Sequence, residues 1–126
     1  MEKKLNDINK FTYQKLGEIL FEMVPQYQSY CNYSLDDFFG NYTFMNEFSI
    51  ALSQEIEKNN ASEFVQNAFK FINDLSASDN LEVLNILKIG ILEILYTSGI
   101  KVRDYSFEQL NNKNKKNFSD FSKLYV

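Results

Sequence analysis

The sequence predicts an all-α protein, a single-domain bundle of about five to seven helices around a central apolar helix at about residues 80–97. Apolar residues recur at spacings of three and four along most of the chain, as they do on one face of a helix. Glycine and proline, which interrupt helices, number only five in 126 residues. Phenylalanine and tyrosine make up 16% of the chain, enough for one packed core, and we expect residues 1–126 to form one domain.

The first half of the chain predicts two long helices joined by an irregular segment. An apolar stripe predicts a helix from Asp7 to Val24. Pro25 either ends that helix or begins a short second one, because proline lacks an amide donor and is tolerated in a first turn. We expect short, irregular helical pieces over residues 26–41, and a second helix from about Thr43 to Lys58.

Two capping signals predict helix starts in the middle of the chain. Asn60 with Glu63 has the spacing of a capping box and predicts a helix over residues 61–77. Asp79 with Glu82 repeats the signal and starts the central helix. That helix is apolar around most of its circumference, so neighbours should cover it from several sides. Gly90 in its interior indicates a close helix crossing, or alternatively a packing defect.

The last quarter of the chain predicts two shorter helices. Gly99 is predicted to end the central helix, because glycine is common just after the last helical residue. After a linking segment, we expect a short helix over residues 106–112 and a last one over residues 113–125 that turns its apolar residues inward. Segments 26–33 and 100–107 favour β-structure locally and could form at most one small hairpin. The inward residues of the last helix are Phe118, Phe121 and Leu124.

Charge is distributed unevenly along the chain. The net charge is −4, but residues 18–93 carry twelve carboxylates against three lysines, a net −9. Residues 1–17 and 94–126 carry +2 and +3. An acidic central body repels nucleic-acid phosphates and attracts a basic partner. Alternatively, the charge serves only to keep an apolar chain in solution.

The composition argues against catalysis and metal binding. The chain has no histidine and one cysteine, Cys31, so it lacks the ligands of a zinc site and the usual base for an activated nucleophile. Glu18 and Glu22 share a helix face but lack the partner residues of a di-iron site. We therefore expect no catalytic residue, metal or cofactor. A lone cysteine and the absence of an apolar span predict a cytoplasmic protein that does not cross a membrane.

One segment, from Asn32 to Phe48, combines aromatic and acidic residues in the manner of a protein interface. Its phenylalanines are expected mainly to fill the core. Its tyrosines are candidate anchors for a partner, and its carboxylates, with two more further along, are candidates for steering a basic partner. The predicted partner-binding residues are Tyr33, Asp36, Asp37, Tyr42, Glu47, Glu55 and Glu57.

The second half of the chain carries a recurring arrangement of packing and capping positions. A helix with apolar spacing leads through an acidic break into a leucine-rich helix, and an aromatic pair follows near the end. The positions are Phe69, Ile72, Leu75, Ser78, Asp79, Val83, Asn85, Glu93, Leu95, Phe118 and Phe121. Over residues 44–124 this arrangement resembles small all-helical immunity proteins of bacterial polymorphic-toxin systems, including contact-dependent growth inhibition.

The resemblance implies a protein that works by binding. Immunity proteins inhibit a cognate toxin domain stoichiometrically, and such toxins are commonly basic nucleases. Two alternatives remain open on the sequence. One is a helical adaptor or self-associating module with no toxin partner. The other, more distant, is a nucleic-acid binder that uses the basic segment from Lys113 to Lys116. The sequence does not set the oligomeric state.

Overall fold

The structure is a computed structural model and describes residues 15–31 and 41–125. Every regular element within these ranges is helical, which confirms the predicted all-α class. The elements are α2 (Leu16–Met23), the 3-10 helix η2 (Pro25–Ser29), α3 (Asn41–Asn59), α4 (Glu63–Leu75), α5 (Leu81–Asn85), the π-helix η4 (Ile86–Leu92), α6 (Glu93–Thr97), α7 (Ile100–Gln109), α8 (Asn112–Asp120) and the 3-10 helix η5 (Phe121–Lys123).

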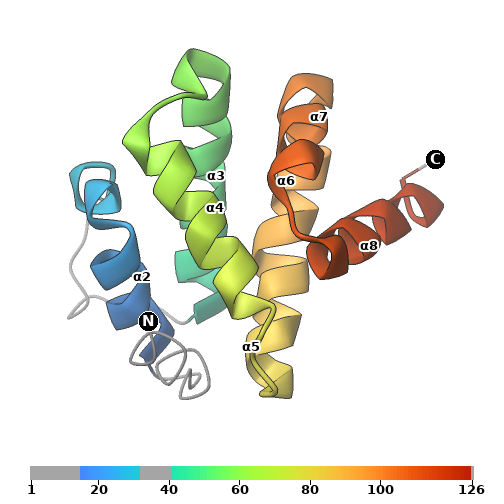
Figure 1. The fold of residues 1–126 in the computed structure, drawn as a ribbon, viewed down its shortest axis with the longest axis horizontal. Coiled ribbons are helices and arrows are strands. Elements are labelled where there is room, and N and C mark those ends of the chain that lie inside the picture. The colour runs from blue at the N-terminus through green and yellow to red at the C-terminus, as the bar shows by residue number, and fades with distance from the viewer. Residues whose placement is uncertain (1–14, 32–40, 126) are drawn as a thin grey trace.

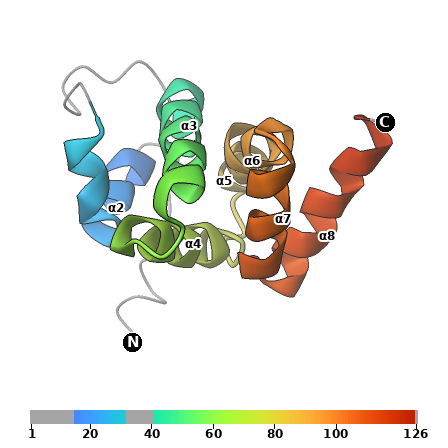
Figure 2. The same cartoon turned by 90° about the horizontal axis from the view of Figure 1, so that it is seen from above.

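The helices α5, η4 and α6 follow one another without a break and form the predicted central helix, residues 81–97. The central helix and α3 lie side by side and run in the same direction (Figure 1). Because they are parallel, the chain must return between them, and α4 makes this return across one face of the pair (Figure 2). The helix α2 lies at one side of the molecule and α8 at the other, as both views show.

The central helix packs against α3 at Gly90. A Cβ atom placed on Gly90 would lie 3.5 Å from Met45 Cβ and 3.8 Å from Asn46 Oδ1. The buried Ser49 hydroxyl ties the pair together, donating to the carbonyl oxygens of Met45 (2.7 Å) and of Gly90 (3.1 Å). The close crossing expected at this glycine is therefore present.

The middle of the central helix is π-helical, which the sequence analysis did not foresee. At the end of η4 the Glu93 amide donates to the Lys88 carbonyl, five residues earlier. A π-helical stretch changes which residues face inward. Neighbours cover this helix less completely than predicted, since Leu81 is 75% exposed and Ile89 is 50% exposed.

Two helix starts lie one or two residues from their predicted caps. The helix α4 is capped by Ser62, whose hydroxyl accepts from the Val65 amide at 3.3 Å, and not by Asn60. The central helix is capped by Asn80, whose side-chain oxygen accepts from the amides of Glu82 (2.9 Å) and Val83 (3.2 Å), and not by Asp79. Each segment offers several residues that can cap, and the one with an extended backbone conformation takes the role.

The prediction of a link with local β-character over residues 100–105 is wrong, because α7 begins immediately after Gly99. That glycine has φ of +108°, a conformation that allows the chain to turn sharply. The Arg103 amide then donates to the Gly99 carbonyl at 3.0 Å, and the residues facing the bundle, Val102 and Ser106, are fully buried. Burial of this inward face decides the structure over local propensity.

Aromatic rings fill the core near α2, α3 and α4. The Tyr27 ring on η2 lies 5.3 Å from that of Phe48 and 6.1 Å from that of Phe64, centroid to centroid. At the other end, Phe118 and Phe121 are buried as predicted. Leu124 is not buried, with 71% of its surface exposed, and the next residue, Tyr125, packs against Tyr96 and Phe121 instead.

We predict that Gly90 tolerates one methyl group but no larger side chain. Gly90→Ala should be neutral or stabilising by up to about 1 kcal/mol, since its Cβ would make ordinary contacts and alanine favours helix. Gly90→Leu should destabilise the protein by about 1–3 kcal/mol by pushing α3 away. Urea unfolding followed by circular dichroism measures both, with Ile89→Leu at the neighbouring exposed position as control. Equal unfolding midpoints for Gly90→Leu and the wild type would contradict the close crossing.

Candidate functional site

The predicted partner-binding residues fall into two groups. Tyr33, Asp36 and Asp37 lie outside the described residues. Tyr42, Glu47, Glu55 and Glu57 all lie on α3, whose outward face is therefore the surface to analyse.

A stripe of exposed side chains runs along α3. At about 100° per residue, positions 47, 50, 54 and 57 fall within one narrow sector of a helix. All four are exposed, and Ile50 is 48% exposed, while Phe48, Leu52 and Ile56 on the inward side are buried. We call this surface the α3 stripe, defined by Glu47, Ile50, Gln54 and Glu57.

The α3 stripe has a carboxylate toward each end and an apolar side chain between them. Glu47 and Glu57 are separated by about 15 Å along the helix axis at 1.5 Å per residue. Ile50 lies between them. Sequence reasoning named the two glutamates but missed Ile50 and Gln54. Counting helical positions outward from the buried phenylalanines would have found them.

The structure separates the other two α3 residues from this stripe. Tyr42 is 38% exposed in the first turn, about 80° around the helix axis from Ile50. Glu55 is only 9% exposed, and its carboxylate lies beside Tyr30, the residue that follows η2. The Tyr30 ring also stacks on Phe64, with centroids 4.6 Å apart. Glu55 thus joins η2 to α3, whereas Tyr42 borders the stripe.

The environment of Tyr30 raises its pKa above the usual value of 10.0. Partial desolvation is the first cause, although 42% of the side chain is exposed, because loss of water disfavours the charged phenolate. The negative charge of Glu55 and its hydrogen bond to the hydroxyl add to the effect in the same direction.

The charge asymmetry of the sequence becomes an asymmetry in space. The helices α2 and α3 carry five carboxylates and one lysine, and they lie on one side of the molecule (Figure 1). The helices α7 and α8 carry five cations against three carboxylates, and α8 lies at the opposite side. A molecule with such a charge separation presents its acidic side to an approaching cationic protein.

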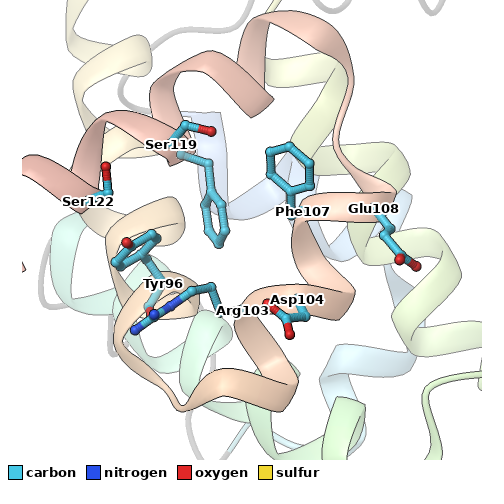
Figure 3. Close-up of a pocket in the computed structure, with 8 residues that line it drawn as sticks. Tyr96, Arg103, Asp104, Phe107, Glu108, Ser119 and Ser122 are labelled. Atoms are coloured by element: carbon cyan, nitrogen blue, oxygen red, sulfur yellow. The ribbon is translucent and has the colours of Figure 1, made fainter.

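A pocket of about 480 Å³ opens between α6, α7 and α8, far along the chain from the predicted residues (Figure 3). None of the predicted partner-binding residues that the structure describes lines it. The lining residues are Tyr96, Arg103, Asp104, Phe107, Glu108, Phe118, Ser119 and Ser122.

Within residues 15–31 and 41–125, no group of three or more histidine, cysteine or acidic side chains is placed to hold a metal ion. Over the same ranges no helix combines the length and the apolar character needed to cross a membrane. Cys31 is partly buried and packs against the core.

Comparison with known protein families gives one match. A family described as "Domain of unknown function (DUF7674)" matches residues 14–121. The chain belongs to this family. The DUF7674 match includes α2 through α8 and ends at the buried Phe121, so it spans nearly all of the described helical bundle. No curated protein and no solved structure matches the chain.

We predict that Tyr30 of this DUF7674 protein titrates above the ordinary tyrosine range, and that Glu55→Gln brings its pKa closer to 10. Because the folded-state pKa is raised, the associated stability is present below about pH 10 and is lost as the pH rises through the folded-state value. NMR spectra of ring-labelled tyrosine against pH measure the shift, with Tyr30→Phe to assign the signal. Glu57→Gln, two residues along and exposed, is the matched control and should leave the Tyr30 pKa unchanged. An equal response to both substitutions would contradict the Tyr30–Glu55 contact.

Proposed function

We propose that this protein is an immunity protein that binds a cognate bacterial toxin domain and neutralises it stoichiometrically, using the acidic side of the molecule. The observation that carries the proposal is the α3 stripe, an exposed isoleucine with a carboxylate toward each end on the more acidic side of the bundle. The toxin as partner comes from the resemblance of residues 44–124 to helical immunity proteins.

The α3 stripe has the chemical layout of a small interface centre. Interfaces commonly combine a desolvated apolar centre with a polar rim, and Ile50 and the glutamates offer these two parts. Tyr33, Asp36 and Asp37, which lie outside the described residues, stay candidates for binding the same partner on the sequence alone. A specific interface needs about 800 Å² from each partner, more than one helix face supplies, so we propose that the contact extends beyond the α3 stripe.

The negative charge of this surface indicates a basic partner. A nuclease presents cations where it binds the phosphates of its substrate. An acidic surface of the inhibitor would approach that groove quickly through electrostatic steering and would cover it or a site beside it. Binding, without catalysis, is sufficient for this function.

The direct test is co-expression with the protein encoded immediately upstream, scored by host survival and by co-purification. We expect the neighbour to be toxic alone, survival to depend on this protein, and the two chains to form a one-to-one complex. A harmless neighbour that forms no complex would contradict the immunity function and would favour an adaptor or self-associating module.

We predict that reversing the charges of the α3 stripe slows association with the toxin. Glu47→Lys combined with Glu57→Lys should reduce the association rate about tenfold at low salt, and the difference should shrink as salt screens the charges. The dissociation rate should change less. Surface plasmon resonance at several salt concentrations measures both rates.

The matched control reverses two exposed carboxylates outside the stripe, with Asp79→Lys and Glu82→Lys at the start of the central helix. It changes the net charge equally and should slow association much less. Equal slowing by the two double variants would show that net charge alone matters and that the α3 stripe is not the binding face.

A further inference from the structure

Arg103 lines the pocket between α6, α7 and α8. It is the only arginine in a sequence that has twelve lysines. Its Nε atom donates to the Tyr96 carbonyl oxygen at 2.9 Å. Its guanidinium carbon lies 4.2 Å from the centroid of the Tyr96 ring. Two independent contacts therefore fix the plane of the guanidinium group, which in an exposed arginine would move freely.

The remaining donors of Arg103 have no anionic partner in the described part of the chain. No carboxylate of residues 15–31 or 41–125 forms an ion pair with it. A guanidinium group offers a planar fork that matches a carboxylate in a bidentate arrangement. Because stacking and the Nε hydrogen bond already hold this fork, little side-chain entropy remains to be lost when an anion binds.

The other walls suit an apolar body and a few polar contacts. Phe107 is 40% exposed at the pocket, and Phe118 lines it. In Figure 3, Arg103 and Tyr96 lie on one side and Phe107 lies on the other, while Ser119 comes from α8 and Ser122 from η5. The volume of about 480 Å³ falls within the range of small-molecule sites and is small for a protein segment.

Two carboxylates limit the charge of the ligand. Asp104 and Glu108 lie one turn apart on α7, and Figure 3 shows their carboxylates away from Ser119 and Ser122. Their negative charge would repel a dianion such as a phosphate monoester more strongly than a singly charged group. Between two anions of similar shape, the pocket therefore favours the one with a single charge.

We propose that this pocket binds a small organic carboxylate whose body is aromatic or branched and apolar. The carboxylate pairs with Arg103, the body contacts Phe107 and Phe118, and Asp104 and Glu108 discourage ligands with a second negative charge. This site is separate from the α3 stripe and does not depend on the proposed binding of a toxin.

Three probes with the same phenylpropyl skeleton and different end-group charges test the charge preference of the wild-type protein. They are 3-phenylpropanoate, 3-phenylpropanol and 3-phenylpropylamine. NMR titration, with the amides of Ser119 and Ser122 as reporters, gives a Kd for each. We expect the carboxylate to bind at least tenfold more tightly than the alcohol and the amine, and inorganic phosphate to bind more weakly than the carboxylate. An amine that binds as tightly as the carboxylate would overturn the proposal and assign the pocket to cations through Asp104 and Glu108.

Substitution of the arginine tests its role. Arg103→Gln should weaken binding of 3-phenylpropanoate at least tenfold and leave binding of the alcohol nearly unchanged, and Arg103→Lys should restore only part of the loss. Lys116→Gln removes the same charge at an exposed position of α8 outside the pocket and serves as the control. If Arg103→Gln does not fold, the three-probe comparison still decides the matter. Equal losses with Arg103→Gln and Lys116→Gln, or no shifts at Ser119 and Ser122 with any probe, would overturn the proposal.

Discussion

The contact between α3 and the central helix is the constraint from which the rest of the arrangement follows. The two helices are parallel, with Met45 beside Gly90 near one end and the Ser53 hydroxyl donating to the Ser98 hydroxyl at 3.0 Å near the other. A parallel pair cannot be joined by a short turn, so α4 has to return between them. Its regular apolar face then covers the pair on one side, leaving α2 and α8 to complete the core at the two ends.

The same geometry explains why a pocket forms at α8. The first turn of α8 is tied to the end of α4, where the buried Asn114 side chain donates to the Ile72 carbonyl and to Asn73 Oδ1, both at 3.2 Å. Further along, the Phe118 ring packs edge-on against Tyr96, with centroids 5.2 Å apart. These two attachments hold α8 at an angle to α7, and the space between them is left partly unfilled. The pocket is thus a consequence of how the last helix is anchored.

The sequence predicted the helices well because their periodicity repeats over many residues, so single ambiguities do not change the result. It predicted precise starts less well, since Asn60 and Ser62 are both good caps and only the backbone conformation distinguishes them. It failed at Ile100–Phe107, where branched and aromatic residues favour strands locally and burial of Val102 against the bundle selects a helix. The π-helical stretch over Ile86–Leu92 had no signal in the sequence, where the apolar spacing fits an ordinary helix.

The candidate sites were harder to predict than the fold, for a related reason. Glu47, Glu55 and Glu57 look alike in sequence, and helical position alone makes two of them exposed and buries the third beside Tyr30. The sequence marks Arg103 only by its being the single arginine of the chain. Its place in the pocket depends on Tyr96, seven positions earlier, which holds its side chain. It also depends on the angle between α8 and α7, which the sequence does not specify.

The acidic side of the molecule links stability to recognition. Like charges on α2 and α3 repel one another, which opposes the compact state. The exposed glutamates of the α3 stripe form no ion pair with any described lysine or arginine, so packing of the core must offset this repulsion. A cationic partner would remove the repulsion when it binds, and a ligand that binds only the folded state stabilises it. The charge that costs the free protein stability would therefore strengthen its complex with a basic partner.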